Sequence, residues 1–299
     1  MNKKAKPMSL KEDLKSQKFV VTTDVIPPKG IAYSKSLKDF GLLKGKVAAV
    51  NVADMPGAKM RMGSLALCVK IKEMGLEPIL QMTCRDRNRI GLQSEMLSAY
   101  VLGIRNILCL RGDNSSDSDN PNTKSVFDLE TVDLLKAGRS LEQGIDLGGN
   151  RLDGAPEFCL GAVLDPGAEN QAAEIEKARL KAEAGAEFFQ TQPVFDVEAF
   201  GEFREKVSFT GVPVLAGVFI FKSAASARFM NKNVPGVHVP QWIIQEMEKG
   251  DEESRSIEIT VRLLKQLSDT CRGVHIMMTA PLHRWIPHIM DEAGIGTRL

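Results

Sequence analysis

Short apolar segments alternate with longer amphipathic segments along the whole chain. The apolar segments are rich in β-branched or aromatic residues and carry charge only near their ends, which is typical of parallel strands covered on both faces. Eight segments have this character: KFVVTT (18–23), KVAAVNV (46–52), EPILQMT (77–83), RNILCL (105–110), FCLGAVL (158–164), AEFFQTQ (186–192), VPVLAGV (212–218) and GVHIMM (273–278).

The segments between them have apolar residues at helical spacing. Clear examples are 64–75, 93–103, 170–185 and 253–271, and the first three end in a glycine, which commonly terminates a helix. An eightfold alternation of strand and helix in 299 residues predicts an α/β protein with a single (β/α)8 barrel. The alternative is a doubly wound open sheet, which favours a glycine-rich turn after an early strand, and the sequence has no GxGxxG motif.

Composition and charge narrow the class of protein. Hydrophobic residues make up 43% and charged residues 26% of the chain, as in an ordinary globular enzyme. The net charge of +1 gives no field that would attract nucleic acid or a membrane surface, and no apolar run approaches the ~18 residues of a membrane span. The basic start lacks the apolar stretch of a signal peptide, so we expect a flexible tail over 1–17 and a barrel over 18–299.

The cysteines and histidines do not predict a metal site. The five cysteines include no CxxC pair, which fits a reducing cytoplasm. His283 and His288 are five residues apart, whereas helical zinc ligands prefer a spacing of four. We therefore expect no bound metal ion.

Polar residues follow several of the expected strands. The active site of a (β/α)8 barrel lies at the carboxyl ends of its strands, where Asp24, Asp113 and Gln192 would converge from distant parts of the sequence. An aspartate after a strand can also cap the next helix or shape a turn, and that interpretation stays open for each residue. No Ser/His/Asp order or P-loop occurs, so catalysis by carboxylates and amides with a bound organic cofactor remains.

Five segments resemble the methylenetetrahydrofolate reductase family, in the family's order and across nearly the whole chain. They are TTDVIPPKG, LQMTCRDRNRIGLQSE, GIRNILCLRGD, AGAEFFQTQPVFD and VPGVHVPQWI. The length matches the short bacterial form that consists of the catalytic barrel. The resemblance implies a cytoplasmic flavoprotein of one-carbon metabolism and methionine biosynthesis, which reduces 5,10-methylenetetrahydrofolate to 5-methyltetrahydrofolate by hydride transfer from flavin N5.

The resemblance also assigns roles to individual residues. Asp24 stands in the place of the family's general acid, a glutamate that protonates N10 of the folate, and Asp113 matches the acid beside the flavin N1 and O2 atoms and the pterin. Substrate contacts are implied for Asp113, Gln192 and Phe195. Cofactor contacts are implied for Asn51, Gln81, Arg111, Gly112, Asp113, Val163, Asp165, Glu174 and Lys181.

Several positions depart from the family pattern. Asp24 is one methylene shorter than glutamate, Gln81 stands where a histidine is common, and Asn51 stands where a threonine is common. A tyrosine and a histidine that hold the flavin after strand five have no counterparts, so FAD is the first expectation and FMN the alternative. The electron donor is NAD(P)H or a partner subunit, and the alternative function is a flavin- or folate-binding subunit that needs such a partner. We expect a homo-oligomer or a hetero-complex.

Overall fold

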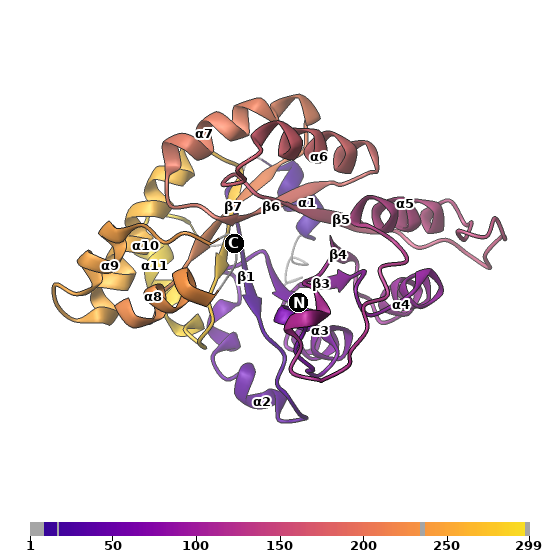
Figure 1. Ribbon diagram of the computed structural model, residues 1–299, viewed down its shortest axis with the longest axis horizontal. Coiled ribbons are helices and arrows are strands. Elements are labelled where there is room, and N and C mark those ends of the chain that lie inside the picture. The colour runs from indigo at the N-terminus through magenta and orange to yellow at the C-terminus, as the bar shows by residue number, and fades with distance from the viewer. Residues whose placement is uncertain (1–8, 17, 234–236, 297–299) are drawn as a thin grey trace, which may run out of the picture.

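The computed structural model describes residues 9–16, 18–233 and 237–296 (Figure 1). Most of the expected tail and the first three residues of VPGVHVPQWI lie outside these ranges. None of the helices in the described part of the chain has the length and apolar character needed to cross a membrane.

Eight parallel strands close into a barrel in sequence order, and the last strand pairs with the first. The single (β/α)8 barrel predicted from the alternating pattern is therefore confirmed, and each strand lies within about two residues of its expected segment. The strands are β1 (Val20–Val25), β2 (Ala49–Val52), β3 (Pro78–Thr83), β4 (Asn106–Leu110), β5 (Cys159–Leu164), β6 (Phe188–Pro193), β7 (Val214–Phe219) and β8 (Gly273–Met277).

Helices surround the barrel (Figure 1). Gly75, Gly103 and Gly185 follow α3, α4 and α6 with φ between 79° and 101°, which confirms them as helix-terminating residues. The helices are α1 (Leu10–Lys15), α2 (Tyr33–Ser36), α3 (Ser64–Glu73), α4 (Arg89–Val101), α5 (Thr131–Glu142), α6 (Gln171–Glu183), α7 (Val197–Lys206), α8 (Ala224–Asn233), α9 (Gln241–Met247), α10 (Glu252–Ser268) and α11 (Ile286–Glu292), with short 3-10 turns η1 (Phe40–Leu43), η2 (Pro56–Ala58), η3 (Ser115–Asp117), η4 (Ser208–Thr210) and η5 (His283–Trp285).

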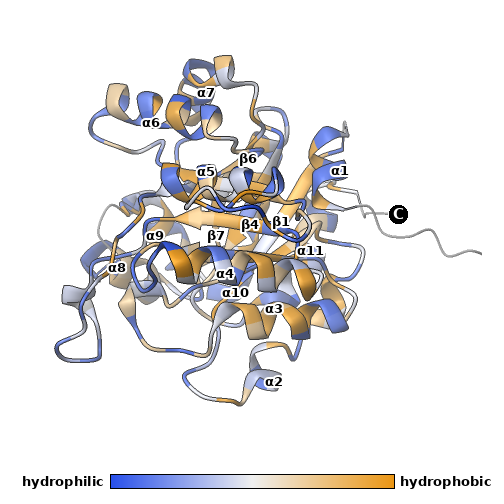
Figure 2. Ribbon diagram, turned by 90° about the vertical axis from the view of Figure 1, so that its right-hand side faces the viewer, coloured by the Kyte–Doolittle hydropathy of each residue, from blue (hydrophilic) through white to orange (hydrophobic). Residues whose placement is uncertain are grey.

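The apolar side chains form three buried clusters. The largest lies between the outer faces of the strands and the helices, which is why the strands in Figure 2 are mostly orange and the helices mix orange with blue. A second cluster joins Phe219 and Phe221 to helices α8, α9 and α10. The third fills the lower interior of the barrel around Phe188 and Leu215. Covering on both faces explains the continuous apolar strand segments.

Residues 10–15 differ from the flexible tail expected over 1–17. They form α1, whose Ser9 and Glu12 side chains bond to each other's backbone N–H groups in a capping box. Leu10 and Leu14 are buried in the cluster inside the barrel. The amino-terminal segment thus closes the bottom of the barrel, because an open lower end would leave apolar side chains such as Phe188 in water.

Candidate active site

Alternate residues of each strand face the barrel interior and form layers along its axis. The lower layer is apolar, and its members belong to the cluster that α1 covers. Two positions further along β1, β2, β6 and β8, the inward-facing residues are polar and buried, and they form a middle layer. The inward-facing residues two positions beyond that layer lie at the mouth, at the carboxyl ends of the strands. The middle layer contains Thr22, Asn51, Gln190 and His275.

The middle layer is a closed hydrogen-bond network. The carboxamides of Asn51 and Gln190 exchange two hydrogen bonds, from Asn51 Nδ2 to Gln190 Oε1 at 2.6 Å and from Gln190 Nε2 to Asn51 Oδ1 at 3.2 Å. Gln190 Nε2 also donates to Thr22 Oγ1 at 3.2 Å, and that hydroxyl lies 3.0 Å from His275 Nδ1. Burial lowers the pKa of His275 to about 3, so the imidazole is neutral at physiological pH.

The side chain of Asn51 is engaged in this network. The resemblance implies that Asn51 contacts a cofactor, and the structure shows its carboxamide already paired with Gln190 inside the barrel. His275 was not proposed as a site residue from the sequence, and Gln190 was noted only as a polar residue near the end of its strand. The available signal was a polar residue inside an otherwise apolar strand segment, which requires a buried partner.

Asp24 lies one layer higher, at the mouth. Its Oδ1 is buried and has no hydrogen-bond partner among the described residues. Burial raises the pKa of Asp24 from 3.8 to about 7, and hydrogen bonds from the backbone of Met278 and of Asp24 itself lower it in part. The residue lines a pocket of about 240 Å³ together with Lys35, Thr279 and His283. Asp24 is therefore an acid that carries its proton near neutral pH.

The other mouth residues of the sequence prediction are spread around the rim. Gln81 on β3 and Val163 on β5 are half-buried, and Gln192 at the end of β6 is exposed. Val163 packs against the inner cluster, as does Leu110 of β4. The rim thus places amide and apolar side chains in one ring.

Asp113 lies in the loop after β4 and bonds to the loop after β2. Its Oδ2 accepts a hydrogen bond from the backbone N–H of Gly57 at 2.7 Å. Gly57 has φ of 64°, a left-handed conformation that glycine adopts at little cost. Gly112 has φ of 90°, and a Cβ there would lie 3.0 Å from Thr83 Cβ and 3.1 Å from Arg85 Cβ. Gly112 therefore lets its loop pack closely on the end of β3, whereas Gly57 is required for its backbone conformation alone.

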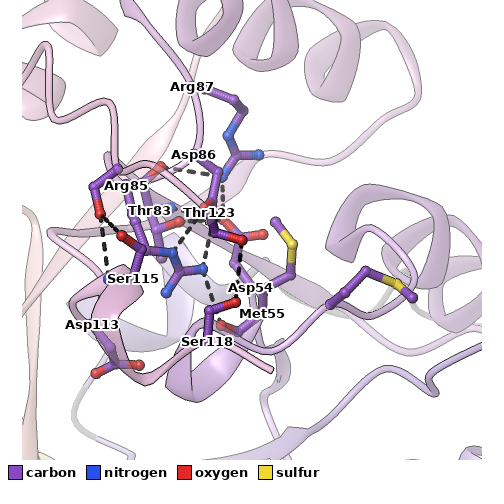
Figure 3. A network of polar contacts seen from close by, with 12 residues as sticks. Asp54, Met55, Thr83, Arg85, Asp86, Arg87, Asp113, Ser115, Ser118 and Thr123 are labelled. Atoms are coloured by element: carbon purple, nitrogen blue, oxygen red, sulfur yellow. Dashed lines mark hydrogen bonds and ion pairs between the residues drawn. The ribbon is translucent and has the colours of Figure 1, made fainter. Parts of the chain in front are cut away.

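A network of charged and polar side chains joins the loops after β2 and β3 (Figure 3). Asp54 Oδ2 accepts from the backbone N–H and the hydroxyl of Thr83, at 2.9 and 3.0 Å, and pairs with Arg87. The guanidinium of Arg85 is fully buried, binds Asp86 with two hydrogen bonds, and donates to Met55 O at 3.0 Å. No role was predicted for these arginines from the sequence, because Met55 and Asp54, which they bind, belong to a separate loop.

Lys181 and Glu174 on α6 face the end of β5. Lys181 Nζ donates to Val163 O at 2.6 Å, and burial lowers the pKa of this lysine. Glu174 is buried, and its Oε1 accepts from Asp165 N at 3.0 Å. Burial raises the pKa of Asp165, and its carboxylate accepts from Gly167 N at 3.0 Å. These three implied cofactor contacts are thus engaged with the backbone around β5.

The remaining predicted residues, Arg111 and Phe195, have partners in the loops after β4 and β7. Arg111 is exposed, forms an ion pair with Glu130 at 3.2 Å, and stacks over the ring of Phe127 at 4.1 Å. Phe195 follows β6 and stacks on Phe221, with ring centroids 6.1 Å apart. Within the described ranges, no group of three or more His, Cys, Asp or Glu side chains could hold a metal ion.

Comparisons with known proteins identify relatives over most of the chain. The family described as methylenetetrahydrofolate reductase matches residues 9–294. A 5,10-methylenetetrahydrofolate reductase of Pectobacterium carotovorum is 27% identical over 243 residues, covering 78% of this chain and 74% of the relative. The Escherichia coli enzyme of that name is 25% identical over 223 residues, covering 74% and 69%. Methylenetetrahydrofolate reductase 2 of Schizosaccharomyces pombe is 28% identical over 243 residues, covering 73% of this chain but only 36% of that relative.

Solved structures share the barrel at lower identity. An uncharacterized protein from Clostridium thermocellum, described as binding two copies of 5-methyl-5,6,7,8-tetrahydrofolic acid, superposes with a TM-score of 0.67 at 16% identity, covering 96% of this chain and 98% of that one. A 2,3-dimethylmalate lyase superposes with a TM-score of 0.52 at 12% identity, covering 95% and 84%. At these identities the likeness concerns the fold alone, and the barrel carries different chemistries.

Proposed function

Because the chain belongs to the methylenetetrahydrofolate reductase family, we propose that it reduces 5,10-methylenetetrahydrofolate to 5-methyltetrahydrofolate. The reaction adds a hydride to the bridging carbon and a proton to N10 of the folate. The observation that carries the proposal is the Asp24 carboxyl at the barrel mouth, which burial holds protonated up to a pH of about 7. A general acid works best when its pKa lies near the operating pH.

The mouth suits the ring system of a flavin, the cofactor on which this family depends. A flavin ring has an apolar edge and an edge of hydrogen-bonding atoms. Leu110 and Val163 offer apolar contacts on the rim, and the carboxamides of Gln81 and Gln192 offer donors and acceptors. Gly112 lets its loop pass close to the rim without a side chain. When bound, the reduced flavin supplies the hydride.

Asp24 contributes the proton in this proposal. Opening the five-membered ring of the substrate requires protonation of N10, since the nitrogen would otherwise leave as an anion. The buried carboxyl holds that proton, transfers it to N10, and is left as a carboxylate that Met278 N–H stabilises in part. Such a general acid contributes about 10²–10⁴ to the rate. We propose that the shorter acid replaces the family's glutamate in this role.

Asp113 and Gln192 contribute binding and charge in this proposal. Asp113 is exposed, and the Gly57 N–H holds one of its carboxylate oxygens in place. A carboxylate near the reacting centre favours the cationic form of the opened substrate. Gln192 is exposed at the mouth and free to bind the pterin, and the half-buried ring of Phe195, three residues further along the chain and supported by the buried ring of Phe221, offers an aromatic contact.

We propose FAD as the flavin, with FMN as the alternative. Lys181 is the cation that would face the phosphate, because its ammonium group retains donors beyond the hydrogen bond to Val163 O. Glu174 and Asp165 would act on the cofactor through the backbone of the β5 loop, where their contacts lie. The electron donor is either NAD(P)H or a partner subunit.

The test uses the purified full chain. Its visible spectrum and the mass of the acid-released cofactor identify the flavin. The flavin is then reduced anaerobically, by NADH or by dithionite, and mixed with 5,10-methylenetetrahydrofolate. We expect reoxidation of the flavin and one equivalent of 5-methyltetrahydrofolate. A chain that binds no flavin, or a reduced flavin that the folate does not reoxidise, would overturn the proposal. Reduction by dithionite but not by NAD(P)H would point to a partner subunit.

A further inference from the structure

The pairing of β1 with β8 ends one residue before the residue proposed as the acid, whereas its pairing with β2 continues. Pairing between β1 and β8 runs from Val20 with Gly273 to Thr23 with Ile276. Val20 N donates to Arg272 O across this pair, so the N–H and C=O groups of the even-numbered residues of β1 face β8. The carbonyl of Asp24 therefore points toward β8 beyond the last paired residue. A buried carbonyl in that position needs a donor from elsewhere.

His283 supplies that donor. Its Nε2 lies 2.7 Å from Asp24 O, and because a carbonyl only accepts, the proton is on Nε2. The imidazole is buried, with 4% exposure, and its ring packs against Phe40 at 4.6 Å between centroids. Burial lowers the pKa of His283, while the Asp24 carbonyl and the charge of Asp39 raise it in part, so the ring is neutral. The contact joins residues 259 positions apart.

The loop after β8 contacts both the side chain and the backbone carbonyl of Asp24. Met278 begins the segment after β8, and its backbone N–H interacts with the Asp24 carboxyl. His283 begins η5 at the end of that segment and binds the Asp24 carbonyl. An aspartate has one torsion fewer than a glutamate, so its carboxyl can correct less for a shift of its own backbone. A misplacement of about 1 Å at a reacting group can cost roughly 10² in rate.

We infer that His283 is a positioning residue for the proposed acid: its Nε2–H fixes the backbone of Asp24 and thereby the place of the Asp24 carboxyl. The inference rests on the proposed function of Asp24. It gives a task to a histidine that neither metal binding nor direct contact with the reacting atoms explains.

The experiment follows the folate half-reaction in stopped flow, with the flavin reduced beforehand by dithionite. His283→Leu removes the donor, His283→Gln keeps an amide N–H at similar reach, and His283→Asn keeps one that is a methylene too short. His288→Gln is the matched control, because His288 is exposed on the following helix. Melting temperature and flavin content are measured for each variant.

We expect His283→Leu and His283→Asn to slow flavin reoxidation by the folate about 100-fold relative to the wild type. His283→Gln should react at least about tenfold faster than either of these variants. His288→Gln should match the wild type. A purely packing role would make the glutamine variant as slow as the others, and that result would overturn the inference, as would a leucine variant with the wild-type rate. If His283→Leu does not fold, the comparison of glutamine with asparagine decides. Failure of the wild type itself to react with the folate would instead overturn the proposed function.

Discussion

The two halves of the barrel mouth are built differently. On the side of β1–β4, charged side chains tie the loops together: Asp113 binds the β2 loop, and Asp119 binds both Lys29 and the backbone N–H of Met60. On the side of β5–β8, the half-buried ring of Phe195 stacks on the buried ring of Phe221, and Lys181 donates to the backbone of Val163. We call the first the fixed half, because its carboxylates tie separate loops together, and the second the open half, because Gln192 is exposed there and Phe195 is half-buried.

The difference indicates that the two halves of the barrel mouth have different roles. Fixed carboxyls suit proton and charge chemistry, because they need no reorganisation during reaction. Aromatic and amide groups suit binding of ring systems. The middle layer of Thr22, Asn51, Gln190 and His275 connects the halves, since its members come from β1, β2, β6 and β8.

The largest expected effect comes from removing the acid of the fixed half. Asp24→Asn should lower the rate of the folate half-reaction by about 10²–10⁴, because the carboxamide cannot deliver a proton. Reduction of the flavin should be unchanged, since Asp24 has no part in that step. Stopped-flow measurement of both half-reactions checks this.

Asp24→Glu and the pH profile sharpen the same prediction. The longer acid should keep or raise the rate if reach is limiting. In the wild type, the folate half-reaction should fall about tenfold per pH unit above the Asp24 pKa of about 7, because the carboxyl loses its proton there. A folate rate that survives in Asp24→Asn, or one that is flat from pH 6 to pH 9, would show that Asp24 is not the acid.

The next effect concerns the layer that joins the halves. Burial lowers the pKa of His275 to about 3, well below the value of about 6.5 in an unfolded chain. The unfolded state therefore binds a proton first as pH falls, and the free energy of unfolding should drop by about 1.4 kcal/mol per pH unit between about pH 6.5 and pH 3. Urea unfolding of wild type and His275→Gln at several pH values isolates this slope.

His238→Gln is the control for that comparison, since His238 is exposed. It should leave the pH dependence of stability unchanged. If His275→Gln shows the same slope as the wild type, then the imidazole does not titrate on unfolding, and the middle layer is not the acid-sensitive link between the halves.

A smaller effect is expected from adding a side chain at Gly112, where the loop after β4 packs against Thr83 and Arg85. Gly112→Ala puts a methyl group near Thr83 and Arg85 at a φ of 90°, and should destabilise the fold by roughly 1–3 kcal/mol. Gly30→Ala in the β1 loop meets open space and should change the stability by less than about 0.5 kcal/mol. Equal melting temperatures for the two variants would contradict close packing at Gly112.

The smallest effect is expected on the open half. Lys181→Met should weaken flavin binding about five- to tenfold, the size of one lost hydrogen bond, while leaving the folate half-reaction of the loaded protein intact. Lys206→Met is the matched change at an exposed lysine of the neighbouring helix α7, and it should not alter flavin affinity. Fluorescence titration with the flavin measures both, and an unchanged affinity for Lys181→Met would restrict this lysine to its bond with Val163 O.

The sequence predicted the barrel because its signals are local. Strand segments follow from apolar runs, and helix ends follow from glycines such as Gly75 and Gly103, whose positive φ the structure confirms. The position of Asp24 at a strand end also followed from the pattern, since every strand carboxyl end of a (β/α)8 barrel reaches the same face. Its raised pKa did not, because burial depends on the whole loop arrangement.

The side-chain partners could not be predicted, because they depend on barrel closure and loop packing. Asn51 pairs with Gln190 across the barrel, and Glu174 turns to the backbone of Asp165 rather than to the mouth. Helix α1 was missed because a six-residue segment in a charged stretch gives too little periodicity. The two pairings are contacts between elements, which no local pattern encodes, whereas α1 did have a local signal in the capping box of Ser9 and Glu12.

Closure of the barrel also sets the order in which the site can form during synthesis. Thr22 contacts His275, which lies 253 residues later in the chain. Asp24 contacts His283, which lies 259 residues later. Until the ribosome has released that carboxyl-terminal segment, the first strand lacks one neighbour, and the acid lacks the environment that raises its pKa. Contacts so distant in sequence form late in folding. The surroundings of Asp24, near the start of the chain, are therefore among the last parts of the protein to be completed.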